Sequence, residues 1–307
     1  MTALGPVVLG TRGSKLALVQ AESCAEKLRV TGMNVEVRVI KTTSEHHPDL
    51  PLSVIDQRDV FTRQLDEAML SGEIDLAVHS LKDIPTEIPH GIVISAITER
   101  HDPSDALVSD SRHSVNNLPE GAVVATSSLR RRAQLLHQRP DLTTVEIRGN
   151  VDTRIRKMRE GQADALVLAR AGLERLGLDT PHTVIPWETM LPAVGQGALA
   201  VTSLKDHSLR QEIRSALNHE STERATLAER SMLRALEGGC RVPVGGQAMV
   251  EGDKVRLKGL VASPDGALVY KGEAEGEDPE VVGESLARDL ISQGAEIILS
   301  EIREVRA

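Results

Sequence analysis

The chain has 307 residues, is 40% hydrophobic and 26% charged, and carries a formal net charge of −9 at pH 7. This composition is that of an ordinary globular protein, and the length accommodates two or three domains. Only Phe61, Trp187 and Tyr270 are aromatic and no apolar run is long enough to span a bilayer, so base stacking on single-stranded nucleic acids and membrane insertion are both disfavoured.

Short apolar runs alternate with amphipathic stretches along the first two thirds of the sequence, which predicts alternating strands and helices. Helices are expected at 16–28, from about 61 to Gly72, after 126–128 up to Pro140, and after 148–150. Strands are expected at 7–9, 35–40, 74–78, 122–125, 143–147, 165–168 and 198–201. This order is typical of doubly wound α/β layers.

Polar residues follow several of these strands, where ligands bind in doubly wound folds. The turns also precede helices, whose free N–H groups and positive dipole ends attract anions. Ser14 is the expected N-cap of the first helix. The residues concerned are Thr11, Arg12, Ser14, Ser80, Lys82, Asp83, Thr126, Ser127, Ser128 and Arg148.

Basic residues cluster against the acidic balance of the chain, notably at 130–132, 154–157, Arg148, Arg170 and Arg175. Such local concentration indicates a specific anionic ligand, and arginine suits bidentate recognition of carboxylates. For Arg156, Lys157 and Arg159 we expect an ordinary solvated helix face instead. Successive helical residues point about 100° apart, so at most two of the three arginines at 130–132 face one site. We expect Arg132 to point outward.

Two segments, 101–105 and 192–197, are predicted hinges, so the chain crosses twice between two lobes around a cleft. After about residue 217 the pattern changes to a helix, alternating strands and a final helix over roughly 279–303, which predicts a smaller α+β domain. The expected domains are 1–98 with 198–216, then 99–197, then 217–307.

The two cysteines have different settings. Cys24 borders the apolar stripe of Leu18, Ala21, Ala25 and Leu28, so we expect a small core residue. Cys240 follows two glycines and precedes an arginine, which favours an accessible thiolate. A chance cysteine in a glycine turn is the plain alternative.

Asp83 follows Lys82 at the end of an apolar strand. A carboxylate there can move protons or stabilise a cation, although an ordinary turn aspartate has the same position. The histidines show no metal-ligand spacing, so we expect them to be solvated and predict no metal site.

Six segments, taken together and in order, resemble the hydroxymethylbilane synthases, also called porphobilinogen deaminases. They are 9–14 (LGTRGS), 77–85 (AVHSLKDIP), 126–131 (TSSLRR), 148–154 (RGNVDTR), 193–198 (AVGQGA) and 238–243 (GGCRVP). The resemblance covers nearly the whole chain. It implies three domains, the first two similar to periplasmic binding proteins.

The resemblance also implies an activity. These transferases join four porphobilinogen molecules head to tail with loss of ammonia, and the linear tetrapyrrole hydroxymethylbilane enters porphyrin and haem biosynthesis. The chain grows on a dipyrromethane cofactor held by a thioether, which is expected here at Cys240. Each pyrrole carries two carboxylates, in agreement with the clustered arginines.

Residue roles follow from the matched motifs. Asp83 is the expected catalytic residue, beneath the pyrrole nitrogens. Cofactor carboxylates would be bound by Ser80, Lys82, Thr126, Ser128, Arg130, Arg131 and Arg154. Incoming substrate and the growing chain would meet Arg12, Ser14, Gln20, Arg148, Arg175 and Gln196.

The expected protein is a cytoplasmic monomer. The N-terminus lacks a basic segment followed by an apolar one, so no signal peptide is predicted, and two unlike cysteines suggest a reducing compartment. Its partners are porphobilinogen and the growing polypyrrole, with no nucleic acid and no membrane.

Three other functions remain open from the residues alone. A non-enzymatic anion-binding protein would show no turnover in the parent and would still bind its ligand after Asp83→Ala. A cysteine hydrolase would be labelled at Cys240 by an alkylating inhibitor, although no histidine is placed to serve as its base. A nucleic-acid binder using the 130–132 arginines would show salt-sensitive binding to DNA.

One segment departs from the family pattern. A lid loop rich in glycine and lysine, often GKGxF, usually precedes the helix that starts near Phe61, but this chain has LSVIDQRDVF at 52–61, in which Arg58 replaces one lysine. Without glycines the backbone has fewer accessible conformations. We therefore expect a stiffer or differently placed lid, formed around Arg58 and Phe61.

Limited proteolysis tests this expectation. The 52–61 segment should be cleaved more slowly than a variant in which Val54 and Asp59 are both replaced by glycine, because the native segment has less backbone freedom. Equal cleavage rates, with and without substrate, would count against a stiffer lid.

Overall fold

The computed structural model describes residues 5–41, 62–236 and 242–304. The chain divides into two compact units, Met1–His101 with Ala198–Glu223 and Asp102–Gly197 with Arg224–Ala307. Each is discontinuous in sequence, because the segment from Ala198 onward returns to the first unit. The units are described separately below.

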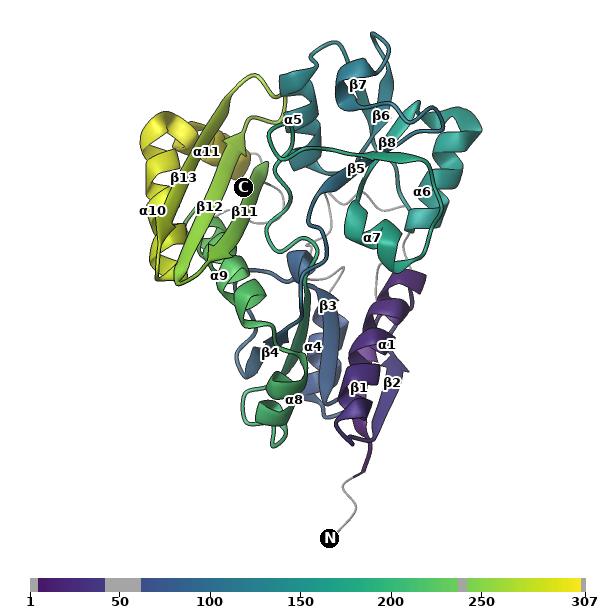
Figure 1. Ribbon diagram of the computed structural model, residues 1–307, viewed down its shortest axis with the longest axis vertical. Coiled ribbons are helices and arrows are strands. Elements are labelled where there is room, and N and C mark those ends of the chain that lie inside the picture. Colours follow the sequence, from purple (N-terminus) through teal and green to yellow (C-terminus); the bar gives the residue numbers. More distant parts are fainter. Residues whose placement is uncertain (1–4, 42–61, 237–241, 305–307) are drawn as a thin grey trace. The chain divides into compact units, whose positions relative to one another are not determined.

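The first unit is built on a five-stranded sheet with strand order β2-β1-β3-β10-β4 (Figure 1). Strands β1, β2 and β3 are parallel, and β10 is antiparallel to both neighbours. Their sequences are rich in Val, Ile and Leu, as expected for strands covered on both faces. The strands are β1 (Val7–Thr11), β2 (Val35–Val39), β3 (Leu76–Ser80), β4 (Ile92–Ile97) and β10 (Leu199–Leu204).

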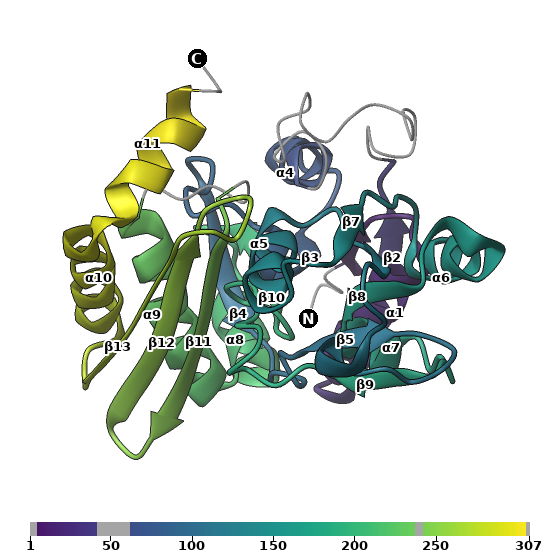
Figure 2. The ribbon, with the colours of Figure 1, turned by 90° about the horizontal axis from the view of Figure 1, so that it is seen from above.

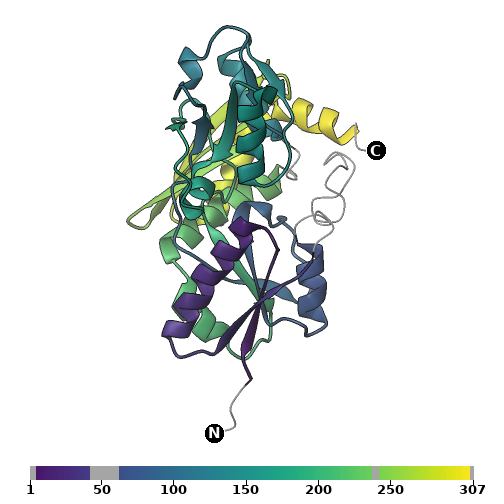
Figure 3. The same ribbon diagram turned by 90° about the vertical axis from the view of Figure 1, so that its right-hand side faces the viewer.

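Helices cover both faces of this sheet. Helices α1 (Lys15–Val30) and α8 (Arg210–Leu217) share a core with one face, and α4 (Arg63–Leu70) shares a core with the other. Figure 3 shows the purple helix α1 and the blue helix α4 on opposite sides of the strands. Cys24 is buried in the α1 core, as predicted, but Leu18 is exposed, so the buried stripe is narrower than expected.

The second unit contains a five-stranded sheet of the same plan, with order β7-β6-β8-β5-β9. Its fourth strand, β5, is antiparallel to both neighbours, as β10 is in the first unit. One face is covered by α5 (Leu129–Gln138), and the other by α6 (Val151–Lys157) and α7 (Arg170–Arg175). The strands are β5 (Asp105–Val108), β6 (Val123–Ala125), β7 (Thr143–Val145), β8 (Ala165–Ala169) and β9 (His182–Val184).

A three-stranded antiparallel sheet completes the second unit, in the order β11 (Val244–Glu251), β12 (Lys254–Ala262) and β13 (Val269–Gly276). One face packs on α9 (Glu220–Ala235), α10 (Pro279–Leu290) and α11 (Glu296–Glu304), as Figure 2 shows. The predicted single helix over 279–303 was wrong. It breaks at the π-helical turn Ile291–Ala295, where Gly294 has φ +119°.

The other face of this sheet meets α5. Leu260 and Ala262 share a small core with Ala133 and Leu191, and Trp187 packs against it. The turn between β12 and β13 comes so close to α5 that the carbonyl oxygen of Gly266 lies 3.0 Å from His137 Nδ1. Two α/β sheets covered on both faces and a separate α+β region confirm the predicted fold class.

Gly266 is required at this contact for two reasons. Its φ is +75°, and a Cβ atom would lie 2.5 Å from the Ala133 carbonyl oxygen and 2.6 Å from the His137 nitrogen. We expect Gly266→Ala to lower the free energy of unfolding by about 2–4 kcal/mol, from backbone strain plus the clash. Gly252→Ala is the control, since Gly252 has φ +61° but open space around it, and should cost only about 1 kcal/mol. Equal losses in chemical denaturation would contradict this.

Candidate active site

In the first unit, the turn after β1 is held by its own hydroxyl groups. Ser14 Oγ accepts a hydrogen bond from the Ala17 N–H at 3.3 Å, which confirms Ser14 as the N-cap of α1. Thr11 Oγ1 donates to the Ala17 carbonyl at 3.1 Å. These two bonds fix the path of the turn that carries Arg12.

The end of β3 lies beside α1. Gln20 Nε2 donates to Ser80 Oγ at 3.1 Å, although the two residues are 60 positions apart. Gln20 is buried, so a polar side chain occupies a place on the core-facing side of α1. Immediately after Ser80 comes the short 3₁₀ helix Leu81–Asp83, whose Lys82 and Asp83 are partly exposed. The structure therefore brings together predicted residues of α1 and β3.

His79 precedes this group and differs from the sequence expectation. It is buried rather than solvated, with Nε2 3.4 Å from Thr202 Oγ1. Burial, together with the nearby Arg12 charge, lowers the pKa of His79 from 6.5 to about 4. The imidazole is thus neutral at pH 7 and adds no charge beside Lys82 and Asp83.

In the second unit, side-chain hydroxyl groups also hold the turn between β6 and α5 by hydrogen bonds. Ser128 is the N-cap of α5, and its Oγ accepts from the Arg131 N–H at 3.4 Å. Thr126 Oγ1 accepts from the Ser128 N–H at 3.2 Å. Ser127 Oγ donates to the Ile147 carbonyl at 2.7 Å, which ties this turn to the end of the neighbouring strand.

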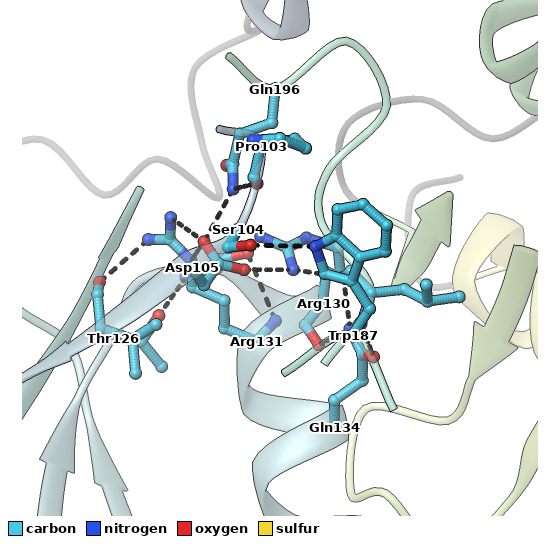
Figure 4. A network of polar contacts seen from close by, with 12 residues as sticks. Pro103, Ser104, Asp105, Thr126, Arg130, Arg131, Gln134, Trp187 and Gln196 are labelled. Atoms are coloured by element: carbon cyan, nitrogen blue, oxygen red, sulfur yellow. Dashed lines mark hydrogen bonds and ion pairs between the residues drawn. The ribbon is translucent and has the colours of Figure 1, made fainter. Parts of the chain in front are cut away.

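A buried carboxylate, Asp105, lies at the centre of the arginine cluster (Figure 4). Arg130 Nη1 donates to Asp105 Oδ2 at 2.7 Å. Arg131 donates to Asp105 Oδ1 through Nε at 3.0 Å and Nη2 at 2.8 Å. The same oxygen accepts from Gln196 Nε2 at 2.9 Å. Arg132, in contrast, is exposed, as predicted from the helical spacing.

The electrostatics of this cluster follow from its burial. Burial alone would raise the pKa of Asp105, but the Arg130 and Arg131 guanidiniums outweigh it and hold that pKa well below its usual range. Two cations therefore face one ionised carboxylate. Arg130 Nε is buried and has no hydrogen-bond partner in the described part of the chain. Surplus positive charge and an unsatisfied donor fit a ligand that carries carboxylates.

The other predicted arginines contact different parts of the unit. Arg154 Nε donates to the Gly149 carbonyl at 2.7 Å, and Arg175 Nη2 donates to the Gly197 carbonyl at 2.6 Å. Arg148 is within 3.4 Å of Glu146. The predicted lid residues Arg58 and Phe61, and the predicted attachment residue Cys240, lie outside the described residues.

Asp105 was not predicted as a functional residue, because the segment 101–105 was interpreted as a hinge. Asp105 is in fact the first residue of β5 and is fully buried. The available signal was an aspartate directly before the apolar run Ala106–Leu107–Val108, because a charge that enters a core strand needs a partner. The residues next to Asp105 in the sequence do not indicate that its partners are Arg130 and Arg131, which lie 25 and 26 positions later.

The fold and these sites define a class of protein: an α/β protein with two sheets of one plan and a buried arginine pair suited to an anionic ligand.

A family model described as "Porphobilinogen deaminase, dipyromethane cofactor binding domain" matches residues 7–212. A second, described as "Porphobilinogen deaminase, C-terminal domain", matches residues 224–292. The chain belongs to the porphobilinogen deaminase family, and is thus a transferase with hydroxymethylbilane synthase activity and a dipyrromethane cofactor.

Relatives named as porphobilinogen deaminases match this chain over nearly their full length. The porphobilinogen deaminase of Rubrobacter xylanophilus is 65% identical, with 98% of this chain and 99% of that protein covered. That of Syntrophomonas wolfei is 45% identical, with 96% and 98% covered. Among solved structures, a periplasmic substrate-binding protein of an ABC transporter from Coxiella burnetii is 17% identical, with a TM-score of 0.44 and 71% and 94% covered. A likeness at that score supports no conclusion here.

Among the described residues, no helix is long and apolar enough to cross a membrane. The same residues contain no group of three or more His, Cys, Asp or Glu side chains arranged to hold a metal ion.

The buried His79 makes stability depend on pH. Its pKa is lowered to about 4 in the folded state from 6.5, so the unfolded chain binds the proton first as pH falls. The free energy of unfolding therefore carries no penalty from His79 above pH 6.5. Below pH 6.5 it decreases, by up to about 3 kcal/mol as the pH approaches 4. We expect His79→Gln to flatten this part of the profile in denaturation experiments. His90→Gln, which alters an exposed imidazole of the same unit, should keep the parent slope. Identical slopes for both variants would contradict the account.

Proposed function

We propose that this chain builds hydroxymethylbilane with Asp83 as its catalytic residue and its clustered basic residues as carboxylate ligands. The observation that supports this most directly is the buried arginine pair, Arg130 and Arg131, which retains surplus positive charge after pairing with Asp105. A polypyrrole carries two carboxylates per ring, so it supplies the negative charge that this cluster lacks.

The residues proposed to bind cofactor carboxylates are Ser80, Lys82, Thr126, Ser128, Arg130, Arg131 and Arg154. When bound through Cys240 as a thioether, the dipyrromethane supplies the pyrrole end on which condensation starts. Arginine forks fix the direction of each carboxylate and so orient the chain for successive additions.

Asp83 supplies the acid–base and electrostatic chemistry. It follows β3 directly, in the short helix Leu81–Asp83, where it is partly exposed and adjacent to Lys82. Porphobilinogen becomes cationic as it loses ammonia, and a fixed carboxylate stabilises that charge. The same carboxylate moves protons at the pyrrole nitrogens.

Incoming substrate is oriented by the remaining predicted residues: Arg12, Ser14, Gln20, Arg148, Arg175 and Gln196. Gln20 is already held by Ser80, so one hydrogen bond joins a substrate ligand to a cofactor ligand. Arg58 and Phe61 belong to the proposed lid. This division of roles explains why hydroxyl and amide groups accompany the arginines, since they orient a ligand without adding charge.

We also propose three domains with the bounds 1–98 with 198–216, 99–197 and 217–307, and a monomer that works in the cytoplasm without a nucleic-acid or membrane partner. The net charge of −9 favours solubility and disfavours nucleic-acid binding. Light scattering coupled to size-exclusion chromatography tests the oligomeric state. A measured mass equal to that of a dimer would contradict the proposed monomer.

Asp83→Ala tests the catalytic assignment. We expect turnover of porphobilinogen to fall by about 10²-fold or more, because the variant loses both charge stabilisation and proton transfer. The thermal midpoint should stay near that of the parent, since Asp83 is partly exposed. Asp110→Asn, which alters an exposed aspartate paired with Arg159, is the control and should turn over like the parent. Retention of more than roughly a few per cent of the parent rate would reject Asp83 as the main catalytic group.

A further inference from the structure

Asp105 is buried in the second unit and contacts three residues to which binding roles are assigned above. Its two oxygens accept hydrogen bonds from Arg130, Arg131 and Gln196 at 2.7–3.0 Å. Asp105 itself has no exposed surface, so it does not meet substrate from solvent. Its effect on any ligand must therefore pass through the side chains it holds.

The orientation of each guanidinium is determined by more than one bond. Arg131 Nη1 donates to the Val167 carbonyl at 3.0 Å, on the side away from Asp105. Arg130 Nη1 also donates to the Leu191 carbonyl at 2.7 Å. Because each arginine donates to two acceptor residues, Asp105 and a backbone carbonyl, neither can change rotamer without losing charge-assisted hydrogen bonds. Within the described part of the chain, Asp105 is the acceptor that both arginines share.

The segment that carries Gln196 is held at several points. Gln196 Nε2 donates to the Pro103 carbonyl at 2.7 Å as well as to Asp105. The Gly195 N–H donates to Glu229 Oε2 at 2.8 Å, and the other oxygen of Glu229 accepts from the Ala248 N–H at 2.8 Å. Glu229 is fully buried in α9, the helix that precedes the Cys240 segment. Two buried carboxylates thus fix this segment between β5 and α9.

We propose that Asp105 is the positioning residue of the anion site: it holds Arg130, Arg131 and Gln196 in their binding orientation before the cofactor arrives. This inference rests on the proposed function of those three residues. A preset orientation lowers the entropic cost of ligand binding and keeps bound carboxylates in register with the reacting end. A shift of about 1 Å in such a supporting residue is enough to impair a site.

Asp105→Glu provides the first test, because it keeps the charge but moves the carboxylate by one methylene. We expect less cofactor per chain by intact mass, and at least a tenfold lower kcat/KM in the cofactor-loaded fraction at a temperature well below its thermal midpoint. A merely structural role would lower the midpoint alone and leave loaded, folded molecules with the parent kcat and KM. That second result would overturn the proposal.

Asp141→Asn is the matched control. Asp141 also pairs with an arginine of the same unit, Arg139, through Oδ1 at 2.7 Å and Oδ2 at 2.6 Å, just after α5. The variant should therefore show the general cost of losing an aspartate–arginine pair, with the parent's cofactor content, kcat and KM. Equal losses in Asp141→Asn and Asp105→Glu would also overturn the proposal.

A second measurement uses the unaltered chain and covers the case in which Asp105→Glu does not fold. Arginine Nε–H signals can be followed by NMR in isotope-labelled protein made with and without porphobilinogen. The Arg131 Nε–H, which donates to Asp105, should be protected from exchange in both samples. The Arg130 Nε–H, which is buried and lacks a partner in the described structure, should gain protection only with the cofactor. An Arg131 Nε–H that exchanges freely in cofactor-free protein would contradict the preset orientation.

The two proposals fail in different ways. A parent protein that neither gains the mass of the cofactor nor converts porphobilinogen would contradict the proposed function. The Arg131 signal would still report on Asp105, because it requires no cofactor. A fully active parent with a freely exchanging Arg131 would reject Asp105 alone.

Discussion

The pairing of one buried carboxylate with two buried guanidiniums is the constraint on which the second unit depends. Charges in a protein core are costly unless they are paired and hydrogen-bonded. Asp105 satisfies this requirement for Arg130 and Arg131 only in part, since one negative charge faces two positive charges. In the proposed function, the carboxylates of the cofactor meet the remaining positive charge. A local basic site of this kind is compatible with the net charge of −9 of the whole chain.

The first unit has a sheet of the same plan but a different set of charged side chains at its strand ends. Its polar residues also follow the parallel strands, but burial keeps His79 neutral, so Arg12 and Lys82 supply the positive charge there. The proposed function assigns to Asp83 the stabilisation of a cation that forms only during reaction. It assigns carboxylate binding to the arginines of the second unit. Repeating one plan in both sheets places the ligand-binding turns of each at equivalent strand ends.

Most of the architecture could be predicted because it depends on local patterns. Apolar runs identified most of the strands, and Ser14 and Arg132 were interpreted correctly from capping and helical spacing. Features that depend on long-range contacts were missed. The role of Asp105 depends on residues 25 and 91 positions away. The burial of His79 depends on the sheet around it, and the break at Gly294 on a positive φ that composition does not reveal.

The candidate site shows the same division. Motifs identified the arginines, hydroxyls and Asp83, because these residue types are needed for carboxylate binding and proton transfer. The motifs did not reveal which of them are already hydrogen-bonded to the protein. Gln196 and Gln20 were assigned to substrate, yet one donates to Asp105 and the other to Ser80. Such prior contacts restrict the orientation of each side chain and so determine what it can bind.

The most direct test is the intact mass of the purified protein, with peptide mapping of the segment around Cys240, compared with Cys240→Ser. The account predicts added mass equal to two linked pyrroles on Cys240 in the parent, and no covalent addition in Cys240→Ser. An unmodified parent that stays unmodified after incubation with porphobilinogen would contradict the account, as would a Cys240→Ser protein that carries the cofactor covalently.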